Sequence, residues 1–200
     1  MRHIPTILIY SRLILGLIIL FFSYLSVENY EVIAILLLTI GVLTDIFDGI
    51  IARQLNVSTQ KMRRLDSTID QFFFICVVAA TYLQCPNFFE NEKIFMFVLI
   101  GFELLTYLIS FLKFRKEVAT HTLSAKIWTL ILFATLIEII LKCESNTLFL
   151  ICFWIGILTR LEIIVIILIL KNWTNDVPTF YHALDLRKGK NIKRNKFFNG

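Results

Sequence analysis

Four aspartates lie close together in the sequence, at the facing ends of two apolar segments: Asp45, Asp48, Asp66 and Asp70. On a helix, Asp45 shares a face with Asp48 at a spacing of i and i+3, and Asp66 shares a face with Asp70 at i and i+4. Because like charges repel strongly where water is scarce, four converging carboxylates need a cation among them. Oxygen ligands suit hard divalent ions, so the pattern predicts a site for Mg²⁺, Mn²⁺ or Ca²⁺.

Small and basic residues accompany the first pair of aspartates. Gly49 and Ala52 lie on the same helical face as this pair, and Arg53 follows directly. Gly49 and Ala52 leave room for a phosphate chain beside the metal, and Arg53 supplies a planar cation for phosphate oxygens. Aspartates at helix ends are also common as simple interfacial charges. That alternative does not account for four of them at helical spacing beside these three residues.

Six apolar segments of membrane-spanning length carry and surround this motif. With 58% hydrophobic and only 18% charged residues, the chain is too apolar for a soluble domain. A span needs about 20 residues, and polar breaks separate six such segments. We therefore predict an all-α integral membrane protein with six transmembrane helices. The predicted helices cover residues 5–25, 32–53, 66–84, 94–113, 124–142 and 147–170.

Lysine and arginine gather in alternate connections between these spans. They are frequent in residues 53–64, in residues 113–126 and in the carboxyl-terminal tail, whereas the opposite connections hold only Lys93 and Lys142. The positive-inside rule therefore predicts that both termini and the aspartate motif face the cytoplasm. We divide the chain into a six-helix membrane catalytic domain, residues 1–171, and a basic cytoplasmic tail, residues 172–200. The tail's charge favours contact with anionic membrane lipid over nucleic acid.

The four cysteines show neither metal-ligand spacing nor a disulfide-rich pattern. We interpret Cys76, Cys85, Cys143 and Cys152 as small buried hydrophobic residues. Cys85 and Cys143 fall near span ends on the same predicted side of the membrane. One disulfide between them is therefore an alternative that the sequence leaves open.

The aspartate motif resembles the signature of the CDP-alcohol phosphotransferases, also called CDP-alcohol phosphatidyltransferases. The likeness rests on Asp45-x-x-Asp48-Gly49-x-x-Ala52-Arg53, followed by Asp66-x-x-x-Asp70. Six spans and cytoplasmic termini are also typical of that family. The resemblance implies a phospholipid-synthesis enzyme that transfers a substituted phosphate group from a CDP-linked lipid donor to a small alcohol acceptor, with release of CMP. It also implies a homodimer.

The resemblance further implies a role for each residue of the motif. Asp45, Asp48 and Asp66 bind metal in that reading, and Asp70 both contacts metal and serves as the catalytic general base. The implied cofactor is Mg²⁺ or Mn²⁺, as two ions. The implied CDP-binding residues are Asp45, Gly49, Ala52, Arg53 and Thr59. Met62 departs from the family pattern, which usually has a glycine at that position.

Two further segments resemble the phosphatidylglycerophosphate synthase branch of the family. One is the amino terminus up to Arg12, and the other is residues 124–129 around Lys126. We therefore favour glycerol 3-phosphate as the acceptor and CDP-diacylglycerol as the donor. Inositol phosphate, serine, an amino alcohol such as choline, and phosphatidylglycerol in cardiolipin formation stay open as acceptors. CDP-amino alcohols stay open as donors.

Three basic residues are candidates for binding the acceptor: Arg12, Lys126 and Arg160. Arg12 and Lys126 have the alternative role of interface anchors, whose long side chains reach the membrane surface. Arg160 and Glu162 lie deep in the sixth span, where each charged residue needs a partner on another helix. For Arg160 the sequence offers Glu103 or Glu138 as a structural partner.

Two other classes of membrane protein also use intramembrane aspartates. Aromatic prenyltransferases bind diphosphate through Mg²⁺, but they need more spans and their motifs lie far apart in sequence. A cation transporter would bind its ion near the bilayer midplane, whereas these aspartates fall at a predicted cytoplasmic boundary. Motifs on consecutive helices of a six-span protein therefore favour the transferase.

Overall fold

The computed structural model describes residues 4–55, 57, 59–116, 118 and 122–190. Within these ranges every regular element is a helix and none is a strand. The helices are α1 (Ile4–Tyr24), α2 (Tyr30–Gln54), α3 (Gln60–Gln84), α4 (Pro86–Asn91), α5 (Lys93–Phe114), α6 (Leu123–Lys142), α7 (Thr147–Ile169) and α8 (Phe180–Arg187).

Six of these helices are long and apolar enough to cross a membrane, namely α1, α2, α3, α5, α6 and α7. They confirm the six predicted spans. The largest difference is the start of α3 at Gln60, ahead of the predicted residue 66. The side chain of Thr59 caps α3, because its hydroxyl oxygen accepts a hydrogen bond from the Met62 N–H at 3.2 Å. Asp66 therefore lies in the second turn of α3 rather than at its start.

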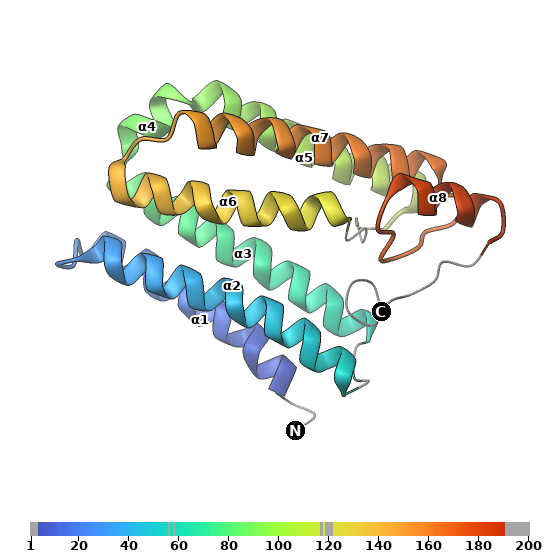
Figure 1. The fold of residues 1–200 in the computed structure, drawn as a ribbon, viewed down its shortest axis with the longest axis horizontal. Helices are drawn as coiled ribbons and strands as arrows, with labels where there is room; N and C mark the ends of the chain where they lie inside the picture. The colour runs from blue at the N-terminus through green and yellow to red at the C-terminus, as the bar shows by residue number, and fades with distance from the viewer. Residues whose placement is uncertain (1–3, 56, 58, 117, 119–121, 191–200) are drawn as a thin grey trace. The chain divides into compact units, whose positions relative to one another are not determined.

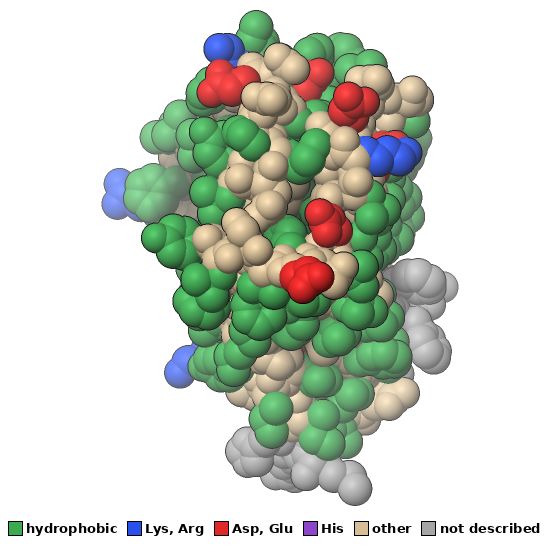
Figure 2. All heavy atoms as spheres, turned by 90° about the vertical axis from the view of Figure 1, so that its left-hand side faces the viewer, with side chains coloured by type: hydrophobic (Ala, Val, Ile, Leu, Met, Phe, Trp, Pro, Cys, Tyr) green, Lys and Arg blue, Asp and Glu red, His purple; other side chains and the backbone are tan. Residues whose placement is uncertain are grey.

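Large hydrophobic side chains are exposed on every spanning helix. Examples, one from each helix in chain order, are Ile14, Leu36, Ile75, Phe97, Leu130 and Leu158. Hydrophobic side chains also cover most of the face drawn in Figure 2, with charged side chains scattered among them. An apolar surface of this extent is unfavourable in water and suits the hydrocarbon of a bilayer. The protein is thus an integral, multi-pass membrane protein.

The chain divides into two compact units. The first comprises the chain up to Glu90 together with Leu136–Glu144, and the second comprises Asn91–Thr135 and the chain from Ser145 onward. The last turns of α6 therefore belong to the first unit and its earlier turns to the second. All four predicted metal-binding aspartates lie in the first unit.

In the first unit, α1 lies beside both α2 and α3 (Figure 1). The buried residues of α1 include Ile9, Arg12, Gly16, Ile19 and Ser23, which are spaced alternately three and four apart. This spacing forms one stripe along a helix, so a single face of α1 contacts its neighbours.

Phe73 of α3 fills the space between these three helices, and it is 1% exposed. A carbon added at Gly16 would meet the Phe73 ring at 3.3 Å, and one added at Gly41 of α2 would overlap that ring. Glycine at these two positions therefore lets α1 and α2 approach α3 closely, as small residues commonly do between membrane helices.

In the second unit, α5 lies beside α7, and α8 packs against α7 (Figure 1). The contact with α8 is a small apolar core of Ile166, Leu170, Val177 and Ala183. The predicted tail therefore begins with a folded segment that the sequence analysis did not anticipate. The division at residue 171 stays a prediction, and the basic residues from 191 onward lie outside the described residues.

Cys85 and Cys143 form a disulfide that ties the end of α3 to the end of α6. The interpretation of these two residues as buried hydrophobic side chains is therefore wrong, because the two helix ends meet and bring the Cα atoms within 5.1 Å. The alternative that the sequence left open is correct. Cys76 and Cys152 are free and buried, as predicted.

We expect Gly41→Ala to lower the free energy of unfolding by about 1–3 kcal/mol, because the added methyl group would overlap the Phe73 ring. The midpoint of thermal unfolding in detergent measures the change. The matched control is Gly101→Ala in α5, where no atom of the described residues lies within 4 Å of the added carbon. Equal effects at both positions would contradict the close approach of α2 to α3.

Candidate active site

One fully buried arginine lies at the centre of the four predicted metal-binding aspartates. Arg12 of α1 is 0% exposed, and its two terminal nitrogens donate to all four carboxylates. Nη1 donates to Asp45 Oδ1 at 2.7 Å and also to Asp70. Nη2 donates to Asp48 and Asp66. Each nitrogen therefore joins one aspartate of α2 to one aspartate of α3.

Helix register and chain reversal bring these five residues together. Arg12 belongs to the buried stripe of α1, between Ile9 and Gly16. The α2 aspartates continue the buried face that includes Gly41, and the α3 aspartates flank buried Ile69 on the same face as Phe73. A short connection joins the end of α2 to the start of α3, so both aspartate pairs lie at the same end of the helices. The motif predicted from the sequence is thus assembled as one cluster.

The four carboxylates differ in exposure. The Asp48 side chain is 2% exposed and forms the base of the cluster. The Asp70 side chain is 29% exposed, and Asp45 and Asp66 are also partly exposed. Asp70 is therefore accessible to a substrate that approaches the cluster, whereas Asp48 is not.

The carboxylates fit a divalent cation. Oxygen atoms of Asp45, Asp48 and Asp66 all lie within 4.8 Å of one another. Arg12 and Arg53 both act electrostatically on Asp48 and Asp66, so two positive charges face four negative ones. All-oxygen ligands of this kind are what Mg²⁺ and Mn²⁺ prefer. Asp70 lies outside the three-carboxylate group but shares Arg12 with it.

The residues predicted to bind CDP lie next to this cluster on α2 and at the start of α3. A side-chain carbon at Gly49 would meet Nη1 of Arg53 at 3.5 Å, so the guanidinium folds back over the glycine. Nε of Arg53 is buried without a hydrogen-bond partner among the residues that the structure describes. Ala52 is buried, and the Thr59 hydroxyl caps α3. These positions are compatible with a phosphate site at Arg53, and contact with a nucleotide stays a prediction.

The burial of Arg12 corrects one of its two predicted roles. An interface anchor would extend to the membrane surface, but Arg12 is enclosed by the aspartates because its helical stripe faces α2 and α3. The sequence held a signal for this placement, since Arg12 continues the spacing of Ile9, Gly16 and Ile19. The acceptor-binding role of Arg12 stays a prediction.

Arg160 and Lys126 belong to the second unit. Nε of Arg160 donates to Glu103 of α5, which confirms one of the two predicted partners. The Arg160 guanidinium also lies over the Trp128 ring, 4.0 Å from its centre. The other candidate partner, Glu138, forms an ion pair with Lys142.

Glu162 and Lys126 are the other two charged residues of the second unit that the sequence analysis singled out. Glu162 accepts a hydrogen bond from the Ser124 hydroxyl of α6, so it also has the predicted partner on another helix. Lys126 is exposed in the first turn of α6. The Arg160–Glu103 and Ser124–Glu162 contacts each join residues that lie far apart in the chain, so no short sequence motif identifies them.

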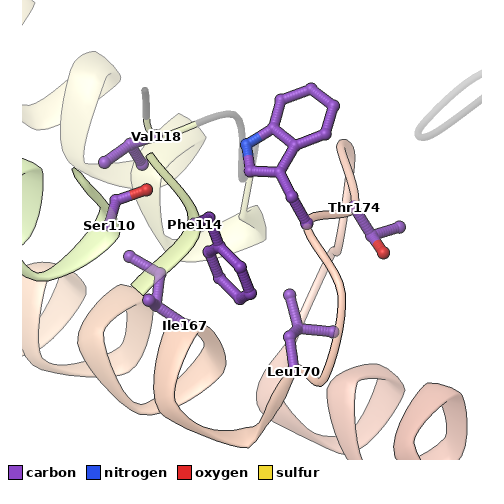
Figure 3. A pocket seen from close by; sticks show the side chains of 7 residues that line it. Ser110, Phe114, Val118, Ile167, Leu170 and Thr174 are labelled. Carbon is purple, nitrogen blue, oxygen red and sulfur yellow. The ribbon is translucent and has the colours of Figure 1, made fainter. Parts of the chain in front are cut away.

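A small pocket lies near the ends of α5 and α7 (Figure 3). Its described lining is mostly apolar and carries no ionisable side chain. The lining residues are Ser110, Phe114, Val118, Ile167, Leu170, Trp173 and Thr174. We assign this pocket no part in catalysis.

Known proteins resemble the chain over nearly its whole length. The sequence profile of the family described as CDP-alcohol phosphatidyltransferase matches residues 2–177. A protein of Aquifex aeolicus (strain VF5), named CDP-diacylglycerol–glycerol-3-phosphate 3-phosphatidyltransferase, is 34% identical over 177 residues, which cover 86% of this chain and 93% of the relative. A second A. aeolicus protein, described as uncharacterized, is 50% identical over 52 residues, or 26% of this chain and 25% of its own. No solved structure gives a significant match.

We expect Mg²⁺ to raise the unfolding temperature of the protein in detergent, because a ligand at 100 times its Kd stabilises the folded state by about 2.7 kcal/mol. Asp48→Asn should remove most of this rise, since it deletes the most buried carboxylate. Asp185→Asn is the matched control, because Asp185 pairs with Lys190 in the second unit. NaCl at equal ionic strength should not reproduce the rise, and a similar response to both salts would refute specific binding.

Proposed function

Because this chain belongs to the CDP-alcohol phosphatidyltransferase family, we propose that it transfers the phosphatidyl group of CDP-diacylglycerol to glycerol 3-phosphate and releases CMP. Family membership makes the protein a transferase of phospholipid synthesis. The choice of donor and acceptor is carried by the A. aeolicus relative, which is named for that reaction and aligns over 93% of its own length.

The aspartate cluster supplies the groups that this chemistry needs. Asp45, Asp48 and Asp66, with Asp70, are the residues that would hold Mg²⁺ or Mn²⁺. Bound metal would neutralise the diphosphate of the donor and the charge that develops on the departing CMP. Arg53, folded over Gly49, is placed to bind phosphate oxygens through its planar guanidinium.

Asp70 is the proposed general base. Its partly exposed carboxylate accepts the proton of the acceptor hydroxyl as the hydroxyl oxygen attacks the β-phosphorus of the donor. The bond from that phosphorus to the CMP oxygen breaks, and a phosphodiester forms in the lipid. Deeply buried Asp48 is less suited to this role, because an acceptor could not reach it.

Two of the three basic residues predicted to bind the acceptor, Lys126 and Arg160, belong to the second unit. Lys126 is exposed at the start of α6, and its assignment to the phosphate of glycerol 3-phosphate rests on the family resemblance of residues 124–129. Arg160 is already engaged by Glu103 and Trp128, which favours a structural role for it. A homodimer rests on the family resemblance.

We expect the purified protein to release CMP from CDP-diacylglycerol with glycerol 3-phosphate and not with serine, inositol, inositol phosphate or phosphatidylglycerol. Asp70→Asn should lower kcat by about 100- to 10,000-fold, because loss of a general base costs that much. Glu138→Gln, which alters an exposed pair with Lys142, should keep the wild-type rate. Release of CMP with another acceptor alone would reassign the acceptor, and full activity of Asp70→Asn would refute the assigned base.

We also propose that the aspartate cluster faces the cytoplasm. Helix α3 carries Asp66 and Asp70 near its start and ends beside Cys85. Cys85 follows these two aspartates by 19 and 15 residues, which span about 29 and 23 Å at 1.5 Å per residue. The cluster and the disulfide therefore lie toward opposite faces of a bilayer about 30 Å thick. Disulfides persist in oxidising compartments and are rare in the cytoplasm, so the Cys85–Cys143 bond supports a cytoplasmic cluster.

Cysteine labelling in whole cells tests this orientation. In a variant with Cys76→Ala and Cys152→Ala, a membrane-impermeant maleimide should label Cys85 and Cys143 from outside after gentle reduction. In a cysteine-free background, Lys61→Cys at the start of α3 should react only after the membrane is permeabilised. The reverse pattern would place the aspartate cluster outside the cytoplasm.

A further inference from the structure

We propose that Arg12 is a resident counter-ion of the metal site, which holds the four carboxylates together before divalent ions bind and leaves them when the ions enter. This inference rests on the metal-dependent function proposed above. It assigns Arg12 a role in controlling metal loading, separate from its predicted contact with the acceptor.

The geometry of Arg12 matches the position of a central cation. Its side chain donates to Asp45 and Asp70 through one nitrogen and to Asp48 and Asp66 through the other. A guanidinium has two hydrogens on each terminal nitrogen, so each of these four donors has one carboxylate. All four aspartates therefore turn toward the same positive centre.

Arg12 and divalent ions require the same ligands. Three of the four carboxylates bound by Arg12 are those whose oxygens lie within 4.8 Å of one another. An ion among them would be only a few ångströms from the guanidinium, and the two positive charges would repel strongly in this buried position. Occupancy by Arg12 and occupancy by ions are therefore mutually exclusive.

The enclosure of Arg12 is incomplete in one respect. Its Nε–H is buried without a hydrogen-bond partner within the described chain, although buried donors are nearly always paired. The cluster thus neutralises the charge of Arg12 and accepts hydrogen bonds from its two terminal nitrogens, but it provides no acceptor for Nε. This arrangement suits a cation that the carboxylates hold until a stronger one replaces it.

Two opposite effects of removing Arg12 follow. Without a cation, the clustered carboxylates repel, so the metal-free protein loses stability. In the wild type, Arg12 occupies the carboxylates for part of the time, and the apparent metal affinity is lowered in proportion to that occupancy. Without Arg12 the carboxylates are always open to ions, so the apparent metal affinity of the variant rises. A purely structural arginine would lower stability without raising metal affinity.

The test measures Mn²⁺ binding to the full-length protein in detergent, from the loss of the electron paramagnetic resonance signal of free Mn²⁺. Arg12→Gln should bind Mn²⁺ about 10- to 100-fold more tightly than wild type. The same variant should unfold at a lower temperature in EDTA. Arg160→Gln is the matched control, because Arg160 is also an ion-paired arginine in a spanning helix. It should lower the unfolding temperature and leave Mn²⁺ affinity unchanged.

Arg12→Lys covers the case in which Arg12→Gln does not fold. A lysine keeps the positive charge but has a single nitrogen, so it cannot bridge four carboxylates as well as arginine does. Because lysine competes less well for the carboxylates, the Arg12→Lys variant should bind Mn²⁺ more tightly than the wild type. The inference is overturned if the folded Arg12 variants bind Mn²⁺ as tightly as the wild type or more weakly. It is also overturned if neither the wild type nor any variant binds Mn²⁺.

CMP release from CDP-diacylglycerol and glycerol 3-phosphate, measured on the same preparations, separates this inference from the proposed function. CMP release by the wild type without tighter Mn²⁺ binding in the Arg12 variants overturns the counter-ion role and keeps the reaction. Tighter Mn²⁺ binding without CMP release by the wild type supports the counter-ion role and overturns the assigned donor or acceptor.

Discussion

The ion pairs between Arg12 and four aspartates constrain how α1, α2 and α3 pack together. Asp45 and Asp48 belong to one spanning helix and Asp66 and Asp70 to the next, and an ionised aspartate at the centre of a span costs about 2.5–3.5 kcal/mol on insertion scales. Near a helix end the cost is smaller, but four such groups still need a shared cation. A shift of one residue in α1 would rotate Arg12 by about 100° away from them, so the ion pairs fix the register of α1.

Close packing acts together with this electrostatic constraint. Gly16 and Gly41 bring α1 and α2 against Phe73 of α3, about one to two turns from the charged cluster. Hydrophobic burial gives membrane helices little reason to associate, because lipid is as apolar as their side chains. Shape complementarity at the glycines and ion pairing at Arg12 therefore hold the three helices together, and the same contacts position the carboxylates.

The parts of the structure that depend on local pattern could be predicted from the sequence. The six spans follow from apolar length, and the aspartate cluster follows from helical spacing on two consecutive helices. The start of α3 was missed because the cap at Thr59 lies in a polar segment that hydropathy alone assigns to a connection. The disulfide and the Arg160–Glu103 pair join distant parts of the chain, so the sequence could offer them only as alternatives.

The placement of Arg12 illustrates the same limit. Its spacing from Ile9 and Gly16 shows which face of α1 it occupies, but not that α2 and α3 present their carboxylates to that face. That knowledge requires the packing of three helices at once. The acceptor specificity is further removed from sequence pattern, because it rests on basic residues that lie far apart in the chain.

The order of the charged residues along the chain matters for how the protein is made. All five members of the cluster lie on three consecutive helices, α1, α2 and α3, which are synthesised before the second unit. An unpaired arginine in α1 or an unpaired aspartate pair in α2 is costly in lipid by itself, but each becomes tolerable once the other is beside it. The chain order therefore favours entry of the first three helices into the bilayer as a group, with their charges already matched, before the second unit is synthesised.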